Sequence, residues 1–417
     1  MKIKNKTLLR HIFRIKGNFN RAVSPSKKCF DGIEIAPYKN GARAAVCISA
    51  DFELNWAFRG RSPEERDLRG VRTRANLPYI LNLLEDHGIP ITWATVGHLF
   101  LKSCNRGTNG LPHPHMPRPL KNDRWEGDWY IHDPCTTYQK DPLWYAPDLL
   151  EKILGSRVKH EVGIHSFSHV DFSPNFSNRE LIRCEITECL AAMEPFGLKP
   201  RSLVFPFNKM GYAYLDVLSD LNINAVRHRD AAIRISYPER TKYGVYKIYE
   251  SMNLRIAKYY DSLNKSKIFI DEAVRRHGVY HLWMHPSDPF EVFQKELKSF
   301  VEYLCGECER LGLWITTMGE LAAYCEAREK TTLTVKREGN ELVVFPDCSV
   351  NQERYGSTEL SLLIPTDGLP KGASVELEKD DRREHQDHKT EEFRFLKEKR
   401  AVVINIPADA KSLRLTF

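Results

Sequence analysis

The stretch Val162-Gly163-Ile164-His165-Ser166-Phe167-Ser168-His169 places two histidines four residues apart, directly after a short apolar run. The apolar run is typical of a buried strand. If the chain curls into a helical turn after it, residues four apart lie on the same side, and both imidazoles can reach one cation. A pair of surface or capping histidines has the same spacing, so the rest of the chain must decide between the two interpretations.

Strand-like apolar runs alternate with helical patterns on both sides of this stretch. The expected strands are 45–50, 89–96, 162–164, 202–205, 225–226, 246–249, 279–284 and 314–316. The expected helices are 77–86, 149–154, 181–196, 214–221, 268–276, 292–311 and 319–327. An alternation of this kind predicts a parallel α/β sheet or barrel.

Polar residues follow several of these strands at the point where each strand ends. They are Asp51 and Glu53 after the first strand, His165 and His169 after the third, Asn208 after the fourth, and His285 after the penultimate one. In parallel α/β folds the carboxyl ends of the strands form the rim of the active site. We therefore expect two carboxylates and three imidazoles from distant segments to meet at one rim.

The chain is expected to contain three regions. Residues 1–40 form a basic N-terminal extension, and residues 41–330 form the α/β region with an insertion at 102–147. Residues 331–417 form a small β-rich domain, because β-branched or alternating runs follow one another there without intervening helical patterns. The charged run 378–400 is interpreted as a solvated hairpin or loop.

The insertion at 102–147 is too long for an ordinary loop and is rich in Pro, Gly, His and Trp. Two interpretations of its tryptophans stay open. They could form a substrate lid, because exposed aromatic rings stack on sugars, or a small satellite core. His113 and His115 have neighbouring prolines and are interpreted as part of a solvated loop rather than as metal ligands.

The overall composition argues against several classes of partner. The net charge of +7 comes from 62 basic and 55 acidic residues, without a basic stripe interleaved with aromatic residues. A nucleic-acid groove needs such a stripe, so no nucleic-acid partner is expected. The ten cysteines are scattered, which fits reduced thiols in a cytosolic protein better than a disulfide framework. The sequence does not determine the oligomeric state.

The N-terminus is basic, and charged residues interrupt each of its apolar runs. Neither a signal peptide nor an integral membrane segment is therefore expected, and a cytoplasmic location is predicted. A basic and partly amphipathic start could still contact an anionic membrane surface, which would make the protein membrane-associated.

Five motifs in order resemble the NodB-type polysaccharide deacetylases, which form carbohydrate esterase family four. The motifs are Ser49–Glu53, Gly88–Trp93, Gly163–His169, Pro206–Asn208 and Leu282–Pro286. The resemblance covers roughly residues 44–327. It implies a distorted (β/α)7 barrel and a hydrolase that acts on non-peptide carbon–nitrogen bonds of a carbohydrate substrate.

The resemblance also implies roles for the acidic residues and the histidine pair. In family members the first acidic residue of the strand motif deprotonates water and a later one ligates the metal. This maps Asp51 to the base and Glu53 to the third ligand, beside His165 and His169. The spacing of the two acids places both on one face of an extended strand. The expected cofactor is a divalent metal, zinc first, with cobalt and nickel as alternatives.

The remaining site residues come from the later motifs. His285 would be the general acid that protonates the leaving amine, a role suited to imidazole near neutral pH. By the resemblance, the backbone N–H of Phe207 would supply an oxyanion contact. Asn208, Trp93 and Trp283 are further candidates for contacts with the oxyanion or the substrate.

Two positions depart from the pattern of many family members. Phe52 stands where a second aspartate is common, and Val204-Phe205 stand where an arginine is expected. Another residue must then orient Asp51 or His285, and the candidates are Arg201, Arg227 and Asp230.

The expected function is metal-dependent removal of an N-acetyl group from an amino sugar of a polysaccharide or its precursor, and an O-acetyl group fits the same machinery. The first alternative is an amide or imide hydrolase on the same scaffold, which could work without metal, as some relatives with Glu in the first motif do. The second alternative is an inactive carbohydrate-binding protein.

Overall fold

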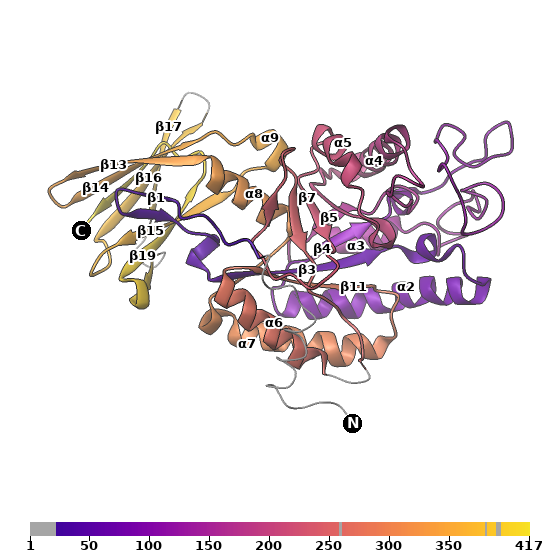
Figure 1. The fold of residues 1–417 in the computed structure, drawn as a ribbon, viewed down its shortest axis with the longest axis horizontal. Coiled ribbons are helices and arrows are strands. Elements are labelled where there is room, and N and C mark those ends of the chain that lie inside the picture. Colours follow the sequence, from indigo (N-terminus) through magenta and orange to yellow (C-terminus); the bar gives the residue numbers. More distant parts are fainter. Residues whose placement is uncertain (1–21, 258–260, 380–381, 389–392) are drawn as a thin grey trace.

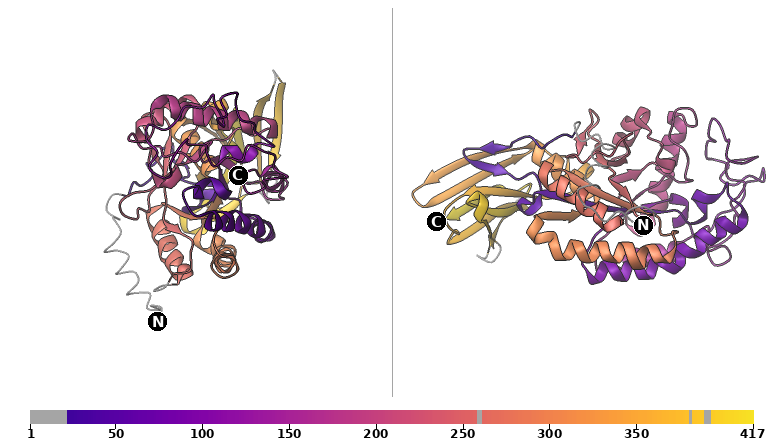
Figure 2. Two further views of the ribbon diagram at one scale, coloured as in Figure 1. Left: turned by 90° about the vertical axis from the view of Figure 1, so that its right-hand side faces the viewer. Right: turned by 60° about the horizontal axis from the view of Figure 1, so that its bottom comes forward.

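The computed structural model of the protein describes residues 22–257, 261–379, 382–388 and 393–417. An α/β body occupies its middle (Figure 1). A region of β-strands lies at one end of the long axis, and the insertion at 102–147 lies at the opposite end (Figures 1 and 2).

A ten-stranded sheet forms the centre of the α/β body. Its strands follow the order β10-β11-β3-β4-β5-β6-β7-β9-β8, and β12 also pairs with β3. Every pairing is parallel except that of β8 with β9. The strands are β3 (Ala44–Phe52), β4 (Thr92–Thr95), β5 (Glu161–Ile164), β6 (Ser202–Val204), β7 (Ala225–His228), β8 (Glu239–Arg240), β9 (Tyr246–Tyr249), β10 (Met252–Asn253), β11 (Val279–Met284) and β12 (Leu313–Thr316).

The sheet forks at β3. Along this strand, β11 pairs with residues 45–50, β12 with 44–47 and β4 with 49–52. A strand has two edges, so β4 and β12 must share the edge opposite β11. The parallel α/β architecture is therefore confirmed. The expected seven-stranded barrel is not found, because the described strands form a forked sheet whose path ends at β10 and β8.

Both faces of β3 are buried, as in other parallel sheets. Its even-numbered residues from 44 to 52 belong to the large core beneath the helices. The other face begins with Ala45 and Cys47 in a second core and ends with the polar residues Ser49 and Asp51. Because side chains alternate along a strand, this inner face changes from apolar to polar toward the carboxyl end. The polar end carries the site described below.

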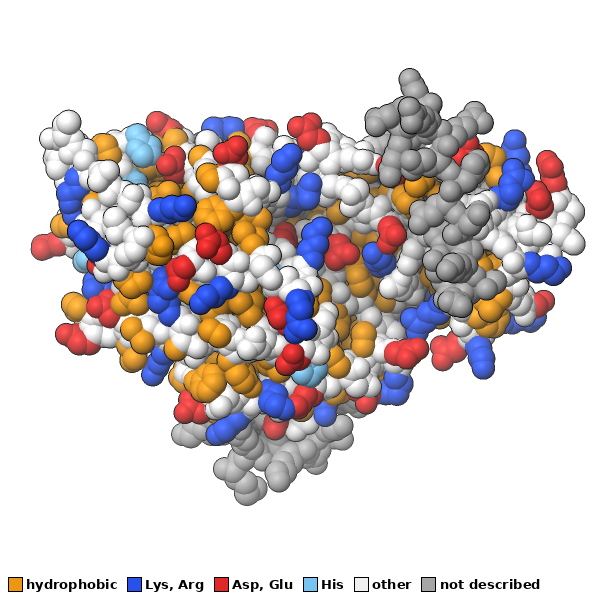
Figure 3. All heavy atoms as spheres, turned by 180° about the vertical axis from the view of Figure 1, so that it is seen from behind, with side chains coloured by type: hydrophobic (Ala, Val, Ile, Leu, Met, Phe, Trp, Pro, Cys, Tyr) orange, Lys and Arg blue, Asp and Glu red, His pale blue; other side chains and the backbone are white. Residues whose placement is uncertain are grey.

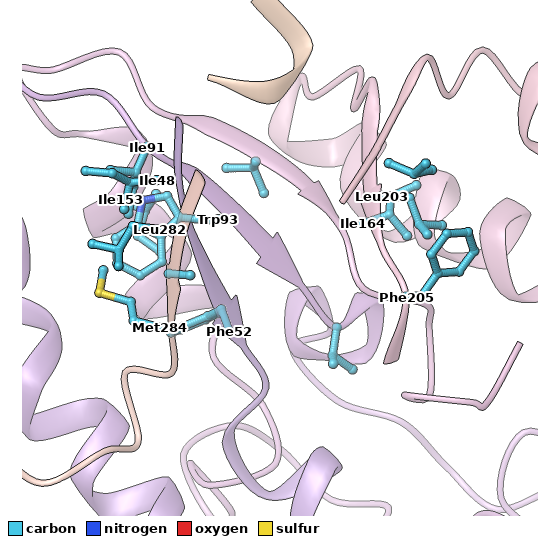
Figure 4. Packing of buried hydrophobic residues seen from close by; sticks show 14 of the residues in the cluster. Ile48, Phe52, Ile91, Trp93, Ile153, Ile164, Leu203, Phe205, Leu282 and Met284 are labelled. Atoms are coloured by element: carbon cyan, nitrogen blue, oxygen red, sulfur yellow. The ribbon is translucent and has the colours of Figure 1, made fainter. Parts of the chain in front are cut away.

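Helices cover the sheet on two sides in the view of Figure 1. They are α2 (Pro63–Asp86), α6 (Ser262–Arg276) and α7 (Lys298–Leu311) on one side, and α4 (Arg179–Met193) and α5 (Leu215–Asp220) on the other, with α3 (Pro147–Leu154) beside the sheet. Apolar residues of β3, β4 and β11 pack together in the core, including Ile48, Trp93 and Leu282 (Figure 4).

Helix α2 begins well before the predicted start at residue 77. Its first half carries mostly charged residues, so the apolar period that predicts a helix is absent there. The start is fixed by the Ser62 side chain, which accepts a hydrogen bond from Glu65 N–H, and by Pro63 in the first turn. Such capping residues are typical of helix N-termini.

Two five-stranded sheets form the β region, and both contribute residues to one core. One sheet has the order β1-β2-β15-β19-β18 and the other β13-β14-β20-β16-β17. Their strands are β1 (Cys29–Phe30), β2 (Ile33–Ile35), β13 (Thr331–Glu338), β14 (Glu341–Cys348), β15 (Glu359–Pro365), β16 (Gly372–Lys379), β17 (Arg382–His388), β18 (Arg394–Leu396), β19 (Ala401–Pro407) and β20 (Ser412–Thr416).

The β region is not built from the C-terminal chain alone. Strands β1 and β2 come from the segment that the sequence analysis assigns to the N-terminal extension, and β2 pairs with β15. The short helix α9 (Gln352–Tyr355) interrupts the run of strands. Helix α8 (Met318–Lys330) is almost entirely buried and packs in the same core, so it joins the β region to the α/β body.

The insertion packs against the α/β body. Trp129 and Trp144 are buried in the large core, so these two are packing residues rather than parts of an exposed lid, although they do not form a separate satellite core. His113 is buried as well, with 5% of its surface exposed. The prediction that His113 lies in a solvated loop is therefore wrong, because its ring is enclosed by Tyr130 and Phe167.

None of the helices in the described part of the chain is both long and apolar enough to cross a membrane. The possible membrane contact through the basic N-terminus falls on residues 1–21, which lie outside the described residues. Lys, Arg, Asp and Glu side chains are interspersed over the face shown in Figure 3.

Candidate active site

A cavity of about 660 Å³ opens at the carboxyl ends of the central strands. This volume lies in the range of typical small-molecule sites. Its lining includes all five of the predicted acidic and histidine residues, together with other predicted contacts and residues of the insertion: Asp51, Glu53, His165, His169, His285, Phe207, Asn208, Trp283, Asp123, Arg124 and Trp125. The expected meeting of these residues at one rim is found.

Three of the lining residues converge on one point. His165 Nε2 lies 3.0 Å and His169 Nε2 lies 3.1 Å from the same oxygen, Oε1 of Glu53. All three side chains are almost fully buried. Burial would raise the pKa of Glu53, but its contacts with the two histidines hold that pKa well below the ordinary value. Burial also lowers the pKa of His169 to about 4, although Glu53 acts in the opposite direction, so the ring is neutral at pH 7.

The contacts of the two ring nitrogens of His165 indicate where its lone pair points. His165 donates its Nδ1–H to the carbonyl oxygen of Val204 at 2.7 Å. In the neutral ring, Nε2 then carries a lone pair, and it faces a carboxylate oxygen that is also an acceptor. Two acceptors at 3.0 Å repel each other unless a proton or a metal cation lies between them. The set of two imidazole nitrogens and one carboxylate oxygen is a donor set that divalent metals such as zinc accept.

The turn that presents the two histidines is not helical, contrary to the expectation. Ser166 and His169 both have a left-handed backbone, each with φ of 55°. Such values are uncommon outside glycine and persist where the surrounding structure enforces them. Here Glu185 of α4 accepts hydrogen bonds from the Ser168 N–H at 2.8 Å and from its hydroxyl at 2.6 Å. Glu185 therefore stabilises the conformation of this turn through two hydrogen bonds.

Asp51 is held by Arg227, one of the three candidates for that role. The guanidinium donates to both carboxylate oxygens, at 2.5 and 2.7 Å. Burial would raise the pKa of Asp51, but Arg227 and then His165 lower it below its ordinary value. Asp51 is therefore ionised at neutral pH. Arg227 also donates to Asn208 Oδ1 at 3.2 Å and lies over the ring of Trp283.

His285 lines the same cavity beside Asp51 and is partly exposed. Its Nε2 is 3.9 Å from Asp51 Oδ2, and its Nδ1 is 3.9 Å from Asp288 Oδ2. The backbone N–H of Asp288 donates to the His285 carbonyl, which fixes the turn after β11. His285 can therefore exchange protons with a group bound in the cavity.

The predicted contact residues divide into two groups. Phe207 has a left-handed backbone with φ of 57°, and its ring packs edge-on against His169. Asn208 and Trp283 also line the cavity. Trp93 does not, because its side chain is fully buried and packs edge-on against Phe52 in the core (Figure 4). Trp93 is therefore a packing residue, and its expected contact with substrate is wrong.

Residues 69–226 match the family model described as polysaccharide deacetylase. This segment is therefore similar to the polysaccharide deacetylases. The resemblance and the hydrolase class predicted from the motifs are thereby confirmed. The deacetylase match contains the histidine pair but neither Asp51 and Glu53 nor His285, and the fold brings these three to the matched segment.

Comparison with the curated proteins found no match. Similar solved structures include a candidate polysaccharide deacetylase from Mycobacterium smegmatis, at 15% identity and a TM-score of 0.49, covering 76% of this chain and 99% of that one. A family 4 carbohydrate esterase from Streptomyces lividans in complex with acetate has 12% identity and a TM-score of 0.33, with coverage of 66% and 92%. An esterase of the same family from Streptococcus mutans has 14% identity and a TM-score of 0.36, with coverage of 66% and 86%.

Sequence reasoning missed residues in and around the cavity. Arg124 of the insertion lies 3.5 Å above the Phe207 ring, and Trp125 lines the cavity beside it. Nothing in the local sequence distinguishes Arg124 from other loop residues, whereas Trp125 is one of the tryptophans for which the sequence analysis left a substrate lid open. Glu185 could have been recognised in the sequence, because it interrupts the apolar stripe of α4 that contains Leu181 and Ile182. A carboxylate on a buried helical face needs a partner, and here the partner is the histidine turn.

The pH profile tests the link between Arg227 and Asp51. A carboxylate that acts as a base must be ionised, so activity that depends on Asp51 as the base falls as the pH drops through its pKa. Arg227→Gln removes the charge that lowers this pKa, so we expect the acid limb of kcat/KM to move to higher pH by about one pH unit. Arg227→Lys keeps the charge and should move the limb less. The measurement is kcat/KM for acetate release against pH.

Arg229→Gln is the matched control, because Arg229 is exposed and pairs with Glu250 at 3.5 Å instead of Asp51. Its acid limb should coincide with that of the unmodified protein. An unchanged limb in Arg227→Gln would mean that Asp51 is not the group whose titration limits activity.

Proposed function

We propose that this protein is a metal-dependent deacetylase that hydrolyses an N-acetyl group on an amino sugar of a polysaccharide or its precursor. The observation that carries the proposal is the convergence of His165 and His169 on one oxygen of Glu53, at 3.0 and 3.1 Å, within a cavity that also contains Asp51 and His285. The family match supports the reaction class.

The three converging residues fit a divalent cation. His165 presents a lone pair because its other nitrogen donates to Val204, and Glu53 and His169 are ionised and neutral, respectively, at pH 7. Glu53, His165 and His169 would hold the metal, with zinc as the first candidate and cobalt or nickel as alternatives. When bound, such a cation polarises a carbonyl and lowers the pKa of water.

Asp51 and His285 divide the proton transfers between them. Asp51 is ionised and held in place by Arg227, so it is the group that can take a proton from the attacking water. His285, 3.9 Å away and reachable from solvent, would donate a proton to the nitrogen that leaves. One group thus accepts a proton and the other donates one, as general base and general acid catalysis require.

The walls of the cavity suit a sugar. Trp125, Trp283 and Phe207 offer aromatic faces, which bind the apolar faces of sugar rings. Arg61 and Arg124 add donors for hydroxyl oxygens. An O-acetyl ester presents the same carbonyl to the same groups, so the proposal includes O-deacetylation as a secondary activity.

Acetate release tests this proposal directly. The purified chain, loaded with zinc, is incubated with an oligomer of an N-acetylated amino sugar, and free acetate is measured. We expect turnover that is lost in the His165→Ala and His169→Ala variants and retained in His115→Ala, whose side chain is exposed and pairs with Glu188.

Two outcomes would replace the proposal with another function. Turnover of a cyclic amide or imide by metal-free protein, without acetate release, would support the amide hydrolase. Binding of the oligomer that survives loss of Asp51 and the histidine pair, without turnover in the unmodified protein, would support a carbohydrate-binding protein.

A further inference from the structure

A second cluster of metal-ligating side chains lies in the insertion and shares no residue with the active site. It consists of His98, Cys104, His113 and Asp133, and we name it the insertion cluster. His98 follows β4, and the other three come from the insertion. His98, His113 and Asp133 are buried, and Cys104 is half-buried.

The ligand atoms of the insertion cluster face one another at short range. His98 Nε2 and His113 Nε2 are 3.1 Å apart, and they lie 2.9 and 2.8 Å from Asp133 Oδ2. Cys104 Sγ lies 3.4 Å from the same oxygen. A tetrahedral zinc site separates nitrogen or oxygen ligands by about 3.3 Å, and separates sulfur from them by about 3.6 Å, given its bond lengths. The observed separations are close to these values.

The hydrogen bonds around the insertion cluster leave lone pairs pointing inward. His98 directs Nδ1 at the Trp144 carbonyl, at 3.4 Å, so in the neutral ring Nε2 is the acceptor. Three atoms therefore face one another at short range: Nε2 of His98, Nε2 of His113 and Oδ2 of Asp133. With both rings neutral, only His113 Nε2 can carry a proton among them. One proton cannot form a hydrogen bond across all three contacts.

The far oxygen of Asp133 is held separately. Oδ1 accepts hydrogen bonds from the Cys135 N–H at 2.9 Å and from the Tyr145 hydroxyl at 3.2 Å. These bonds turn Oδ2 toward the histidines. Ligands of structural metals are commonly fixed in this way by outer hydrogen bonds.

We propose that His98, Cys104, His113 and Asp133 bind a structural zinc ion in tetrahedral coordination. Four protein ligands leave no open position, as in structural rather than catalytic zinc sites. Binding would displace the proton of the Cys104 thiol, because thiolate is the ligand form.

The proposed ion would fasten the insertion to the α/β body beside the active site. The backbone N–H of His98 donates to the Phe167 carbonyl at 3.0 Å, within the turn that carries His165 and His169. The insertion also supplies Arg124 and Trp125 to the active-site cavity. Loss of the ion should therefore expose residues 102–147 to proteases.

Cobalt substitution tests the proposal, because the insertion cluster contains a thiol and the group of Glu53, His165 and His169 does not. The full chain is stripped of metal, loaded with Co²⁺ alone, and its absorption spectrum is recorded. We expect a near-ultraviolet thiolate-to-cobalt charge-transfer band. Cys104→Ser should remove the band, whereas the His165→Ala/His169→Ala double variant should retain it. The Cys29→Ser variant is the control, because Cys29 is exposed in β1 of the β region, and it should retain the band too.

Metal content gives a second readout. We expect about two zinc ions per chain in the unmodified protein and about one in each of Cys104→Ser and the double variant. The absence of a thiolate band in the unmodified chain, or its persistence in Cys104→Ser, would overturn the proposal and leave a network held by a proton on His113. Failure of the active-site proposal alone would leave the band unchanged.

A measurement on the unmodified chain covers the case in which Cys104→Ser does not fold. Alkylation of each cysteine is followed by peptide mass spectrometry with zinc bound and after chelation. Cys104 should react severalfold more slowly with zinc bound, while the exposed Cys29 should react equally in both states. Equal reactivity of Cys104 in both states would contradict its role as a ligand.

Discussion

Asp51→Asn is expected to lower kcat/KM for acetate release by about 1,000-fold while leaving the bound metal in place. General base catalysis contributes about 100- to 10,000-fold, and the amide of asparagine cannot accept a proton at neutral pH. Asp51 is not among the three residues that converge on the proposed metal position. The loss should therefore appear in kcat rather than in metal content, measured on the same preparation.

Asp123→Asn is the matched control, because Asp123 lines the same cavity but pairs with Lys121. Its activity should stay near that of the unmodified protein. Asp51→Asn leaves the buried Arg227 without its carboxylate, which costs stability of several kcal/mol in comparable pairs. Its thermal unfolding must therefore be recorded beside its kinetics. Retained activity in a folded Asp51→Asn protein would remove Asp51 from the mechanism.

Glu53→Gln is expected to weaken zinc binding by about 100-fold or more and to abolish acetate release at limiting zinc. The substitution keeps the shape of the side chain but removes the negative charge that His165 and His169 face. The two imidazoles alone leave an incomplete donor set for a catalytic zinc. Competition with a chromophoric chelator measures the affinity, and acetate release at excess zinc shows how much activity can be restored.

Glu180→Gln is the control for this substitution, since Glu180 is exposed in the first turn of α4. It should bind zinc as the unmodified protein does. Zinc affinity that survives Glu53→Gln would show that another residue completes the site, and Asp51 would then be the nearest carboxylate to examine. Activity that survives together with a loss of metal would favour the metal-free amide hydrolase.

Much of the fold could be predicted because its signals are local. The apolar run at 45–50 becomes β3, and the run at 279–284 becomes β11, since buried strands are read directly from consecutive apolar residues. The start of α2 was not predicted, because its first half is rich in charged residues and lacks the apolar period of a helix. Strand β17 falls in the charged run that was interpreted as a hairpin or loop, and it pairs with β16 as an antiparallel hairpin.

Pairings between distant segments lie beyond such local signals. The fork at β3 depends on which strands take its two edges, and no residue of β12 specifies that choice. In the same way, β2 completes a sheet with β15 across more than three hundred residues. Strand propensity predicts that a segment is extended, whereas its partner is chosen by the packing of the whole chain.

By itself, the sequence predicted the parallel α/β class and the resemblance to the polysaccharide deacetylases. It also predicted that Asp51, Glu53, His165, His169 and His285 meet in one cavity, because strand ends in such folds meet at one rim. Tertiary structure alone decided three other matters. Arg227 was selected over Arg201 and Asp230 as the partner of Asp51, Trp93 was placed in the core, and His113 was buried beside His98 and Asp133. Each depends on the direction of a side chain relative to residues far away in the chain, and such directions are fixed by packing rather than by neighbours in sequence.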